Sequence, residues 1–333
     1  MRKNHPARLL AAAFTLAVAN GFAAPAAPTA PAAFTTSAAP AEALESARLL
    51  ADVRTLASPE FAGRRTGTMG SELAQAYIAR RFEQIGIKPF GASYATPFSF
   101  TAQHGNEKTD FPAAVNLLGQ IRGSSSPERY IVVSAHYDHL GKQGRATYLG
   151  ADDNASGVAA MLAVAAHFKQ HPPRNSIIFA AFDGEELGLK GAIAFVDKPP
   201  VALTSIAFDL NFDMVSRNDK HEIYASGTRY TPALKPLVVS AAALSSVKVL
   251  FGHDSKVKGA PPDHDWTGSS DHGAFHKAGI GYLYFGVEDH ADYHKPSDTF
   301  EKIDPVFFTE VTRVLVATAE LLDQNLDTLK KSP

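Results

Sequence analysis

The sequence predicts an α/β fold, a three-layer sandwich in which helices flank both faces of a central mixed, mostly parallel β-sheet. Strand-like runs of apolar residues alternate along the chain with segments whose apolar residues recur at helical spacing. Several of the predicted strands are almost continuously apolar, as is usual for strands that are buried on both faces of a parallel sheet. Alternation of this kind is typical of a sheet covered by helices on both sides.

The first 43 residues are expected to lie outside this fold. A basic start precedes an apolar run at residues 9–19, which is too short to span a bilayer but suits a signal peptide, so residues 1–23 are predicted to be removed. Residues 24–43 are rich in Pro and Ala without periodicity and are predicted to form an extended linker. No membrane span is expected once the signal is removed. The chain has no cysteine, which fits the periplasm better than a disulfide-rich extracellular scaffold, so a periplasmic or secreted protein is predicted.

Residues 44–333 are predicted to form one catalytic domain, because they contain no internal repeat and no second boundary. Helices are predicted, in order, at residues 44–57, 71–87, 154–170 and 307–326. The second of these ends at Gly86, a usual residue just after a helix. Strands are predicted at residues 114–123, 129–136, 175–183, 205–213 and 279–286. The formal net charge of -2 gives no general attraction to nucleic acid, so none is expected as a partner.

Five groups of acidic and histidine residues lie near the ends of predicted strands. They are AHYDH at 135–139, GADDNASG at 150–157, FDGEELGL at 182–189, NFDMV at 211–215 and DYHKPSDT at 292–299. Imidazoles and carboxylates are suitable zinc ligands, and open α/β sheets bind their ligands beyond the carboxyl ends of the strands. Together the five groups could hold two metal ions.

The residues alone leave several alternatives open. Helix capping explains Asp152 and Asn154, although capping does not need three such residues in a row. The adjacent Glu185 and Glu186 repel each other, which indicates two different tasks, but acids also occur at solvated helix starts. Asp209 and Asp213 would face the same side of one strand, so spacing does not choose between them.

Taken in order, these groups resemble the motifs of bacterial zinc aminopeptidases of metallopeptidase family twenty-eight, which are di-zinc and leucyl-aminopeptidase-like. The resemblance extends from about Leu44 to the C-terminal helix. It implies the zinc-peptidase fold and an exported metallo-aminopeptidase, a hydrolase that cleaves the N-terminal bond of peptides with a free N-terminus. It also implies two Zn²⁺ ions per chain.

The resemblance also implies a role for each matching residue. The metal ligands would be His136, Asp153, Glu186, Asp213 and His294. Asp153 would bridge the two ions, with His136 and Asp213 on one and Glu186 and His294 on the other. The catalytic residues would be Glu185 as general base, Asp138 orienting His136, and Tyr293 as a hydrogen-bond donor to the oxyanion or, alternatively, a packing residue.

Two other functions share this pattern in part. A glutaminyl-peptide cyclotransferase has the same fold and an FDGEE-like motif, but it usually keeps one zinc and lacks an intact GADDNASG pattern. A non-catalytic relative would be expected to have lost ligands, and all five matching positions are present here.

The remaining candidate residues receive less weight. We expect Asp271 and His272 to line the pocket at most, and Trp266 to be a pocket or core residue. His139 is expected in a loop or beside a metal ligand, without a task of its own. Arg64 and Arg65, next to glycines in a predicted turn, are expected to be solvated.

Overall fold

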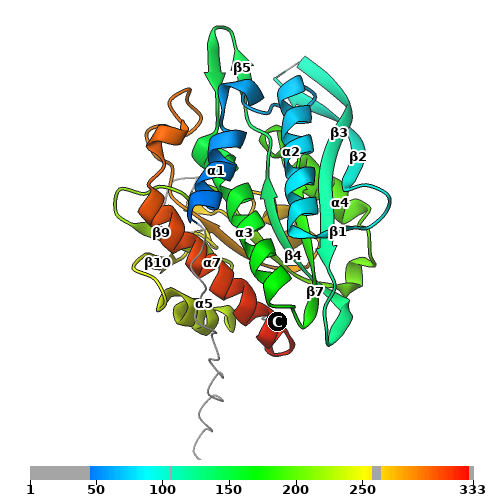
Figure 1. Ribbon diagram of the computed structural model, residues 1–333, viewed down its shortest axis with the longest axis vertical. Coiled ribbons are helices and arrows are strands. Elements are labelled where there is room, and N and C mark those ends of the chain that lie inside the picture. Colours follow the sequence, from blue (N-terminus) through cyan, green and yellow to red (C-terminus); the bar gives the residue numbers. More distant parts are fainter. Residues whose placement is uncertain (1–45, 106, 257–263, 330–333) are drawn as a thin grey trace, which may run out of the picture. The chain divides into compact units, whose positions relative to one another are not determined.

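The computed structural model describes residues 46–105, 107–256 and 264–329, so the predicted signal peptide and linker lie outside the described residues. The predicted sandwich is confirmed, with helices on both faces of a mixed sheet (Figure 1). The helices are α1 (Ser46–Leu56), α2 (Met69–Ile85), α3 (Gly157–Gln170), α4 (Lys190–Asp197), α5 (Leu234–Ala242), α6 (His272–Lys277) and α7 (Pro305–Asn325). The strands of the main sheet are β1 (Lys88–Pro89), β2 (Ala95–His104), β3 (Glu107–Ile121), β4 (Ser126–His136), β7 (Asn175–Phe182), β8 (Ile206–Phe212), β9 (Glu222–Ser226), β10 (Lys248–Phe251) and β11 (Gly281–Gly286).

The centre of the main sheet is parallel and its flanks are partly antiparallel. Within the described chain its order is β1-β3-β7-β4-β8-β11-β9-β10, and β2 pairs with β3. The four central strands β7, β4, β8 and β11 run parallel to one another. Both β3 beside β7 and β9 beside β11 are antiparallel. The carboxyl ends of β4, β7 and β8 therefore lie at one edge of the sheet.

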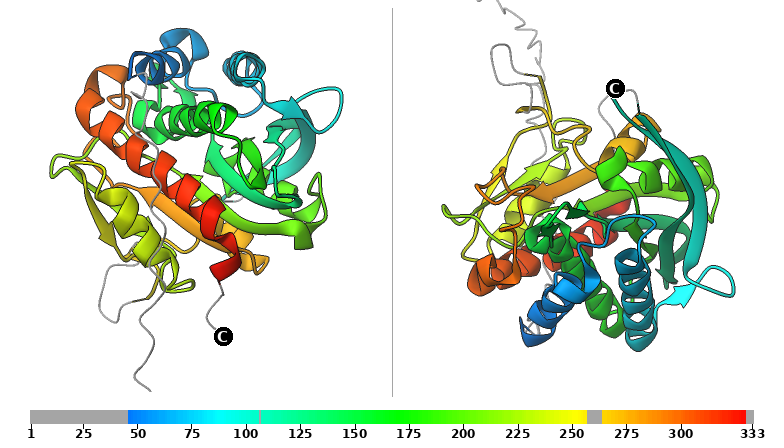
Figure 2. Two further views of the ribbon diagram at one scale, coloured as in Figure 1. Left: turned by 60° about the horizontal axis from the view of Figure 1, so that its bottom comes forward. Right: turned by 90° about the horizontal axis from the view of Figure 1, so that it is seen from above.

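The apolar pattern of the chain explains which elements form the core. Every residue of β7 is buried, as expected for a strand covered on both faces. Helix α3, in which nine residues are buried, packs on β4 and against α1, α2 and α7. These helices lie on one face of the sheet (Figure 2), whereas α4 packs on β3 and α6 packs on β8 and β11.

Local signals set the ends of the longer helices. Helix α2 begins two residues earlier than predicted, because the side chain of Thr68 accepts the backbone N–H of Ser71 and caps it. It ends at Gly86, whose φ of 88° is the left-handed conformation expected for this position. Helix α7 begins at Pro305, before which Asp304 accepts the backbone N–H groups of Val306 and Phe307.

Several elements have no counterpart among the predicted ones. Strand β2 contains Pro97, which argues against a central strand, and it pairs with β3 alone. Strands β9 and β10 have only five and four residues. A further pair, β5 (Gly141–Gln143) and β6 (Ala146–Tyr148), forms a separate two-stranded sheet. Such short or half-exposed segments carry little periodic signal.

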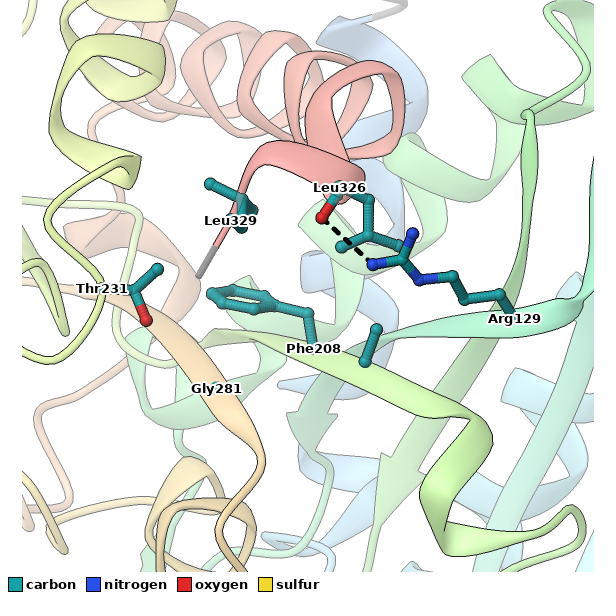
Figure 3. Close-up of a pocket in the computed structure, with 7 residues that line it drawn as sticks. Arg129, Phe208, Thr231, Gly281, Leu326 and Leu329 are labelled. Atoms are coloured by element: carbon teal, nitrogen blue, oxygen red, sulfur yellow. Dashed lines mark hydrogen bonds between the residues drawn. The ribbon is translucent and has the colours of Figure 1, made fainter. Parts of the chain in front are cut away.

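No helix in the described ranges combines the length and hydrophobicity needed to cross a membrane. One pocket opens near the amino ends of β4, β8 and β11, which is the sheet edge opposite the strand ends discussed below (Figure 3). It is lined by Arg129, Ala207, Phe208, Thr231, Gly281, Leu326 and Leu329. None of these is a histidine or a carboxylate, so this pocket is not a metal site.

Candidate metal centre

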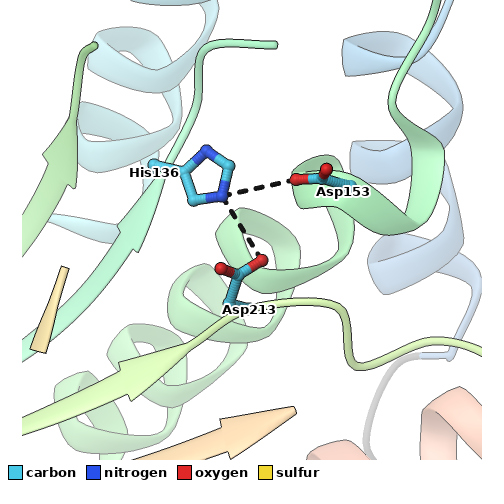
Figure 4. Close-up of side chains that lie close together, drawn as sticks. All are labelled: His136, Asp153 and Asp213. Carbon is cyan, nitrogen blue, oxygen red and sulfur yellow. Dashed lines mark hydrogen bonds and ion pairs between the residues drawn. The ribbon is translucent and has the colours of Figure 1, made fainter. Parts of the chain in front are cut away.

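The ends of two neighbouring parallel strands bring the first donors together. His136 is the last residue of β4, and Asp213 follows the last residue of β8, which pairs with β4. The Nε2 atom of His136 lies 3.3 Å from Asp213 Oδ1 and 3.4 Å from Asp153 Oδ1 (Figure 4). All three side chains are buried, so one imidazole and two carboxylates converge on a space shielded from solvent.

A second group of donors lies on the other side of Asp153. His294 Nε2 is 3.1 Å from Asp153 Oδ2 and 3.1 Å from Glu186 Oε2. Asp153 thus directs one oxygen towards each group. Glu186 follows β7 in a short turn, Glu185–Leu187, and His294 lies in the loop after β11 with a φ of 53°, an unusual conformation for a residue other than glycine. The five predicted ligands therefore lie together.

The donor distances fit tetrahedral zinc. With bonds of roughly 2.0 to 2.1 Å, two ligands of a tetrahedral zinc ion are about 3.3 to 3.4 Å apart. The separations of 3.1 to 3.4 Å within the two groups are close to this value. Although burial lowers the pKa of His294, hydrogen bonds with Asp153 and Glu186 raise it to about 10. The carboxylates thus favour a cation at this place, either a proton or a metal ion.

The loop that carries Asp153 is held by buried side chains. The carboxylate of Asp298 accepts the backbone N–H groups of Asp152 and Asp153 at 3.0 and 3.1 Å. Asn154 Oδ1 accepts the backbone N–H of Gly157, the first residue of α3, at 2.9 Å. Asp152 accepts the backbone N–H of Ser216 at 2.8 Å, which joins the loop to the segment after β8.

Arg64 corrects the prediction that this residue is solvated. Its side chain is fully buried, and its guanidinium donates to the backbone carbonyls of Leu56, Tyr137, Leu149 and Gly150 at 2.6 to 2.8 Å. Four carbonyls that point inward need a donor, and the guanidinium provides enough N–H groups for all of them. Arg65 is exposed, as predicted.

Asp138 lies between His136 and Glu185. His136 Nδ1 is 3.2 Å from the backbone carbonyl of Asp138 and 3.7 Å from its Oδ1, so the backbone oxygen is the nearer acceptor. The same Oδ1 accepts the backbone N–H of Glu185 at 3.1 Å. Asp138 therefore connects the orientation of the imidazole with the position of the Glu185 turn.

The two adjacent glutamates have opposite electrostatic environments. Burial raises the pKa of Glu185 well above its ordinary value, and the nearby carboxylates of Asp213 and Glu186 add to the effect. Burial also raises the pKa of Glu186, but hydrogen bonds with His139 and His294 outweigh it and lower that pKa. Glu186 is thus held as an anion, whereas Glu185 has a high proton affinity.

Tyr293 lies against the second group of donors. Its ring stacks on that of His294, with centroids 3.9 Å apart and planes at 22°. Burial raises the pKa of its hydroxyl group, and the charges of Asp153 and Asp213 raise it further. The hydroxyl therefore stays protonated and able to donate a hydrogen bond.

Two residues beside the centre had received no task from the sequence. His139 is buried, and its Nδ1 lies 2.7 Å from Glu186 Oε1. No local signal in the sequence indicates this contact, because Glu186 lies 47 residues further along the chain. Tyr284 of β11 donates its hydroxyl to the backbone carbonyl of Asp213 at 3.4 Å. Every residue of β11 is buried, so its sequence pattern does not distinguish Tyr284 from a core residue.

The segment after β10 contributes buried residues beside the centre. Burial raises the pKa of Asp271 to about 8, and both of its carboxylate oxygens lack a hydrogen-bond partner within the described chain. His272 is fully buried, with Nε2 2.7 Å from the backbone carbonyl of Trp266 and Nδ1 3.3 Å from Asn211 Oδ1. Trp266 is half-buried, and its ring stacks on the ring of His253 with centroids 3.7 Å apart.

Two relatives match in sequence over part of the chain. A "Probable zinc metalloprotease" from Pyrenophora tritici-repentis is 31% identical over 202 residues, which cover 56% of this chain and 44% of that protein. "Aminopeptidase YwaD" from Bacillus subtilis is 31% identical over 198 residues, covering 56% of this chain and 40% of that protein. The matches thus span less than half of the length of these relatives.

Solved structures match in fold over most of the chain. A zinc aminopeptidase from Bacillus subtilis superposes with a TM-score of 0.64 at 18% identity, covering 83% of this chain and 95% of that one. A glutaminyl cyclase from Bacteroides thetaiotaomicron also has a TM-score of 0.64 and 18% identity, covering 83% and 98%. At this identity the two structures show a shared fold and do not separate the two activities.

The family itself is shown by sequence. Residues 116–319, more than half of the chain, match peptidase family M28, and this range includes all the donors of the two groups. Since this match, the sandwich fold and the paired donors around Asp153 agree, the chain belongs to peptidase family M28, a family of zinc-dependent peptidases.

Proposed function

We propose that the protein is a di-zinc aminopeptidase that removes the N-terminal residue of peptides. One observation carries the proposal: Asp153 directs one oxygen to His136 and the other to His294. Each group then offers three protein donors, which is the number that catalytic zinc sites use while keeping a position open. The metal ligands of the proposal are His136, Asp153, Glu186, Asp213 and His294.

Zinc bound to these donors would lower the pKa of a water molecule and polarise the scissile carbonyl group. Glu185 is the proposed general base, because burial and the neighbouring carboxylates raise its proton affinity more than the charge of His136 lowers it. It would take a proton from the attacking water as the oxygen bonds to the carbonyl carbon. When the C–N bond breaks, the same carboxyl would give that proton to the leaving amine.

Tyr293 is proposed to act on the substrate carbonyl. Its protonated hydroxyl, close to His294, would donate a hydrogen bond to the oxygen that becomes negatively charged during attack. The backbone carbonyl of Asp138 would hold His136 in one orientation through Nδ1, and its carboxylate would hold the Glu185 turn.

We infer cleavage at the N-terminus of the substrate from the negative charges that surround the centre. The centre gathers the carboxylates of Asp153, Glu185, Glu186 and Asp213 in a mostly buried space, which favours a substrate with a positive α-amine. The Bacillus subtilis relative is an aminopeptidase, which supports the same choice. Peptides with a free N-terminus are therefore the proposed substrates.

The alternative is a glutaminyl-peptide cyclotransferase, which the structural likeness to the Bacteroides thetaiotaomicron cyclase favours equally. A panel of aminoacyl-nitroanilides and a peptide with N-terminal glutamine, each with and without chelator, separates the two. We expect chelator-sensitive release of nitroaniline and no pyroglutamate. Pyroglutamate formation without nitroanilide cleavage would favour the cyclase.

Export to the periplasm or the medium is proposed from residues 1–43, with residues 1–23 as the signal and 24–43 as the linker. N-terminal sequencing of the mature protein should give a start near residue 23. A mature protein that begins at Met1 would contradict export by this route.

A further inference from the structure

His139 makes the shortest donor–acceptor contact in the second group of donors, although it is not among the proposed ligands. Its Nδ1 lies 2.7 Å from Glu186 Oε1 and 3.6 Å from Asp153 Oδ2. The contact to Glu186 uses the oxygen that His294 does not approach, since His294 Nε2 lies next to Oε2. Glu186 is thus held from both sides, one oxygen by each histidine.

The distances separate His139 from the ligands. Donors that share a tetrahedral zinc ion lie about 3.3 Å apart, as the two proposed ligand groups approximately do. A separation of 2.7 Å is instead that of a short N–H···O hydrogen bond to a carboxylate. His139, Asp153 and Glu186 lie close enough together to hold a metal ion, but the 2.7 Å separation favours a hydrogen bond from His139 Nδ1 to Glu186 over shared coordination.

The ring of His139 is fixed by close packing. Its side chain is fully buried, and a Cβ added to Gly150 would lie 2.5 Å from its Cγ, so the backbone of Gly150 rests directly on the ring. The other nitrogen, Nε2, has no hydrogen-bond partner in the described ranges. Since a buried N–H without an acceptor is rare, the proton belongs on Nδ1, where Glu186 accepts it.

We propose that His139 is a positioning residue for the second zinc site, an inference that rests on the proposed function. Its Nδ1–H holds Oε1 of Glu186, so that Oε2 points to the space shared with His294 and Asp153. Hydrogen bonds of this kind orient a metal ligand, and their loss typically weakens metal affinity by about 10- to 100-fold.

The test compares three substitutions by zinc affinity, measured by competition with a chelator of known affinity. Asn places an amide nitrogen where Nδ1 stands, because both follow Cγ directly, whereas Gln places its amide nitrogen one atom farther and Phe has no nitrogen. We expect His139→Asn to keep both zinc affinities within a few-fold of the wild type. His139→Gln and His139→Phe should each weaken one of the two sites by about 10- to 100-fold.

Two controls exclude a general loss of packing. Thermal unfolding of the zinc-free proteins should show His139→Phe as stable as His139→Asn, or nearly so. His167→Phe, at a half-buried histidine of α3 outside the donor groups, should leave both zinc affinities unchanged. In the cobalt-loaded His139→Phe variant, the absorption bands of one metal site should stay unchanged. The bands of the other site should shift or disappear.

Three results would overturn the inference. One is wild-type zinc affinity at both sites in His139→Phe. Another is an equal loss of zinc affinity in His139→Asn and His139→Gln, because the effect would then not depend on the hydrogen bond from Nδ1. A wild-type protein that binds fewer than two zinc ions would contradict the proposed function itself. This failure is distinguished from a failure of the inference about His139 because it is seen without any substitution.

Discussion

The guanidinium of Arg64 donates a hydrogen bond to the backbone carbonyl of Gly150 at 2.8 Å, across 86 positions of the chain. A second N–H group of the same side chain reaches the carbonyl of Tyr137, next to His136. Burial lowers the pKa of Arg64 to about 10, which leaves it charged at pH 7, and the charges of Asp153 and Asp298 oppose the shift. One buried cation thus connects the end of β4, where His136 lies, with the loop that carries Asp153.

Arg64→Met should destabilise the zinc-free protein by more than about 3 kcal/mol, because four buried carbonyls lose their donor. Urea unfolding monitored by circular dichroism gives the free energy of unfolding. Arg65→Met, at the exposed neighbour, is the matched control and should change it by less than about 0.5 kcal/mol. Equal effects at both positions would mean that the carbonyl contacts contribute little.

Asp153→Asn should lose both zinc ions more readily than any other single substitution, since its two oxygens serve both donor groups. Asp213→Asn should weaken only one site, because Asp213 contacts His136 and not His294. Elemental analysis after dialysis against a mild chelator should approach two zinc ions for the wild type, one for Asp213→Asn and none for Asp153→Asn. Saturation of the wild type at one ion would favour the cyclase.

Glu185→Gln should leave the zinc content nearly intact and lower turnover by roughly 10² to 10⁴, the usual contribution of a general base. Glu186→Gln should instead weaken zinc binding, because Glu186 contacts His294 and His139. Steady-state kinetics and metal analysis on the same preparations show which glutamate acts as the general base and which binds zinc. The opposite pattern would exchange the roles of the two glutamates.

Acetylation of the substrate N-terminus should slow cleavage at least ~100-fold, which corresponds to about 2.7 kcal/mol of lost transition-state stabilisation. The acetyl group removes the positive charge that the carboxylates attract and adds bulk at the buried end of the substrate. The ratio of kcat/KM for matched free and acetylated peptides measures this loss. Equal cleavage of both would keep a zinc hydrolase but exclude an aminopeptidase.

His167→Phe should make the stability of the zinc-free protein less sensitive to acid. Burial lowers the pKa of His167 to about 4, and the charge of His171 contributes. The unfolded chain, with an ordinary pKa of roughly 6.5, takes up the proton first, so this stabilisation is complete above pH ~6.5 and declines towards pH 4. The variant lacks that decline, and its free energy of unfolding should therefore rise relative to wild type between pH 7 and pH 4.5. Parallel curves would mean that His167 has an ordinary pKa.

The sequence predicted the sheet because the signal of a buried strand is local, whereas the ligand set came from the resemblance to a family and stays a prediction. In β7 the six residues from Ile177 to Phe182 are apolar, and every residue of the strand is buried, as is typical of a short central strand. His136, Glu186 and Asp213 lie at or just beyond the carboxyl ends of β4, β7 and β8, which meet at one edge of the sheet. The choice between Asp209 and Asp213 was open because both face the same side. Asp209, within β8, accepts the Ser134 hydroxyl at 2.8 Å, whereas Asp213 lies beyond the strand end and reaches His136.

The wrong prediction for Arg64 has a physical reason. Glycines on both sides of an Arg-Arg pair indicate an exposed turn, and the turn is indeed present. Its burial depends on carbonyl groups of residues 56, 137, 149 and 150, which three other segments supply. The contact between His139 and Glu186 is non-local in the same way. Spacing along the chain carries no information on such pairs.

The proposed ligands are spread from His136 to His294, and Asp153, Glu186 and Asp213 each lie on a separate connection between elements. A zinc finger can be transplanted as a short peptide because its ligands lie close together in sequence. Here no short segment contains even one complete donor group, and only the ordered sheet brings the groups together. The centre is therefore a property of the whole domain, and engineering it into another protein would require transfer of the sheet and not of a motif.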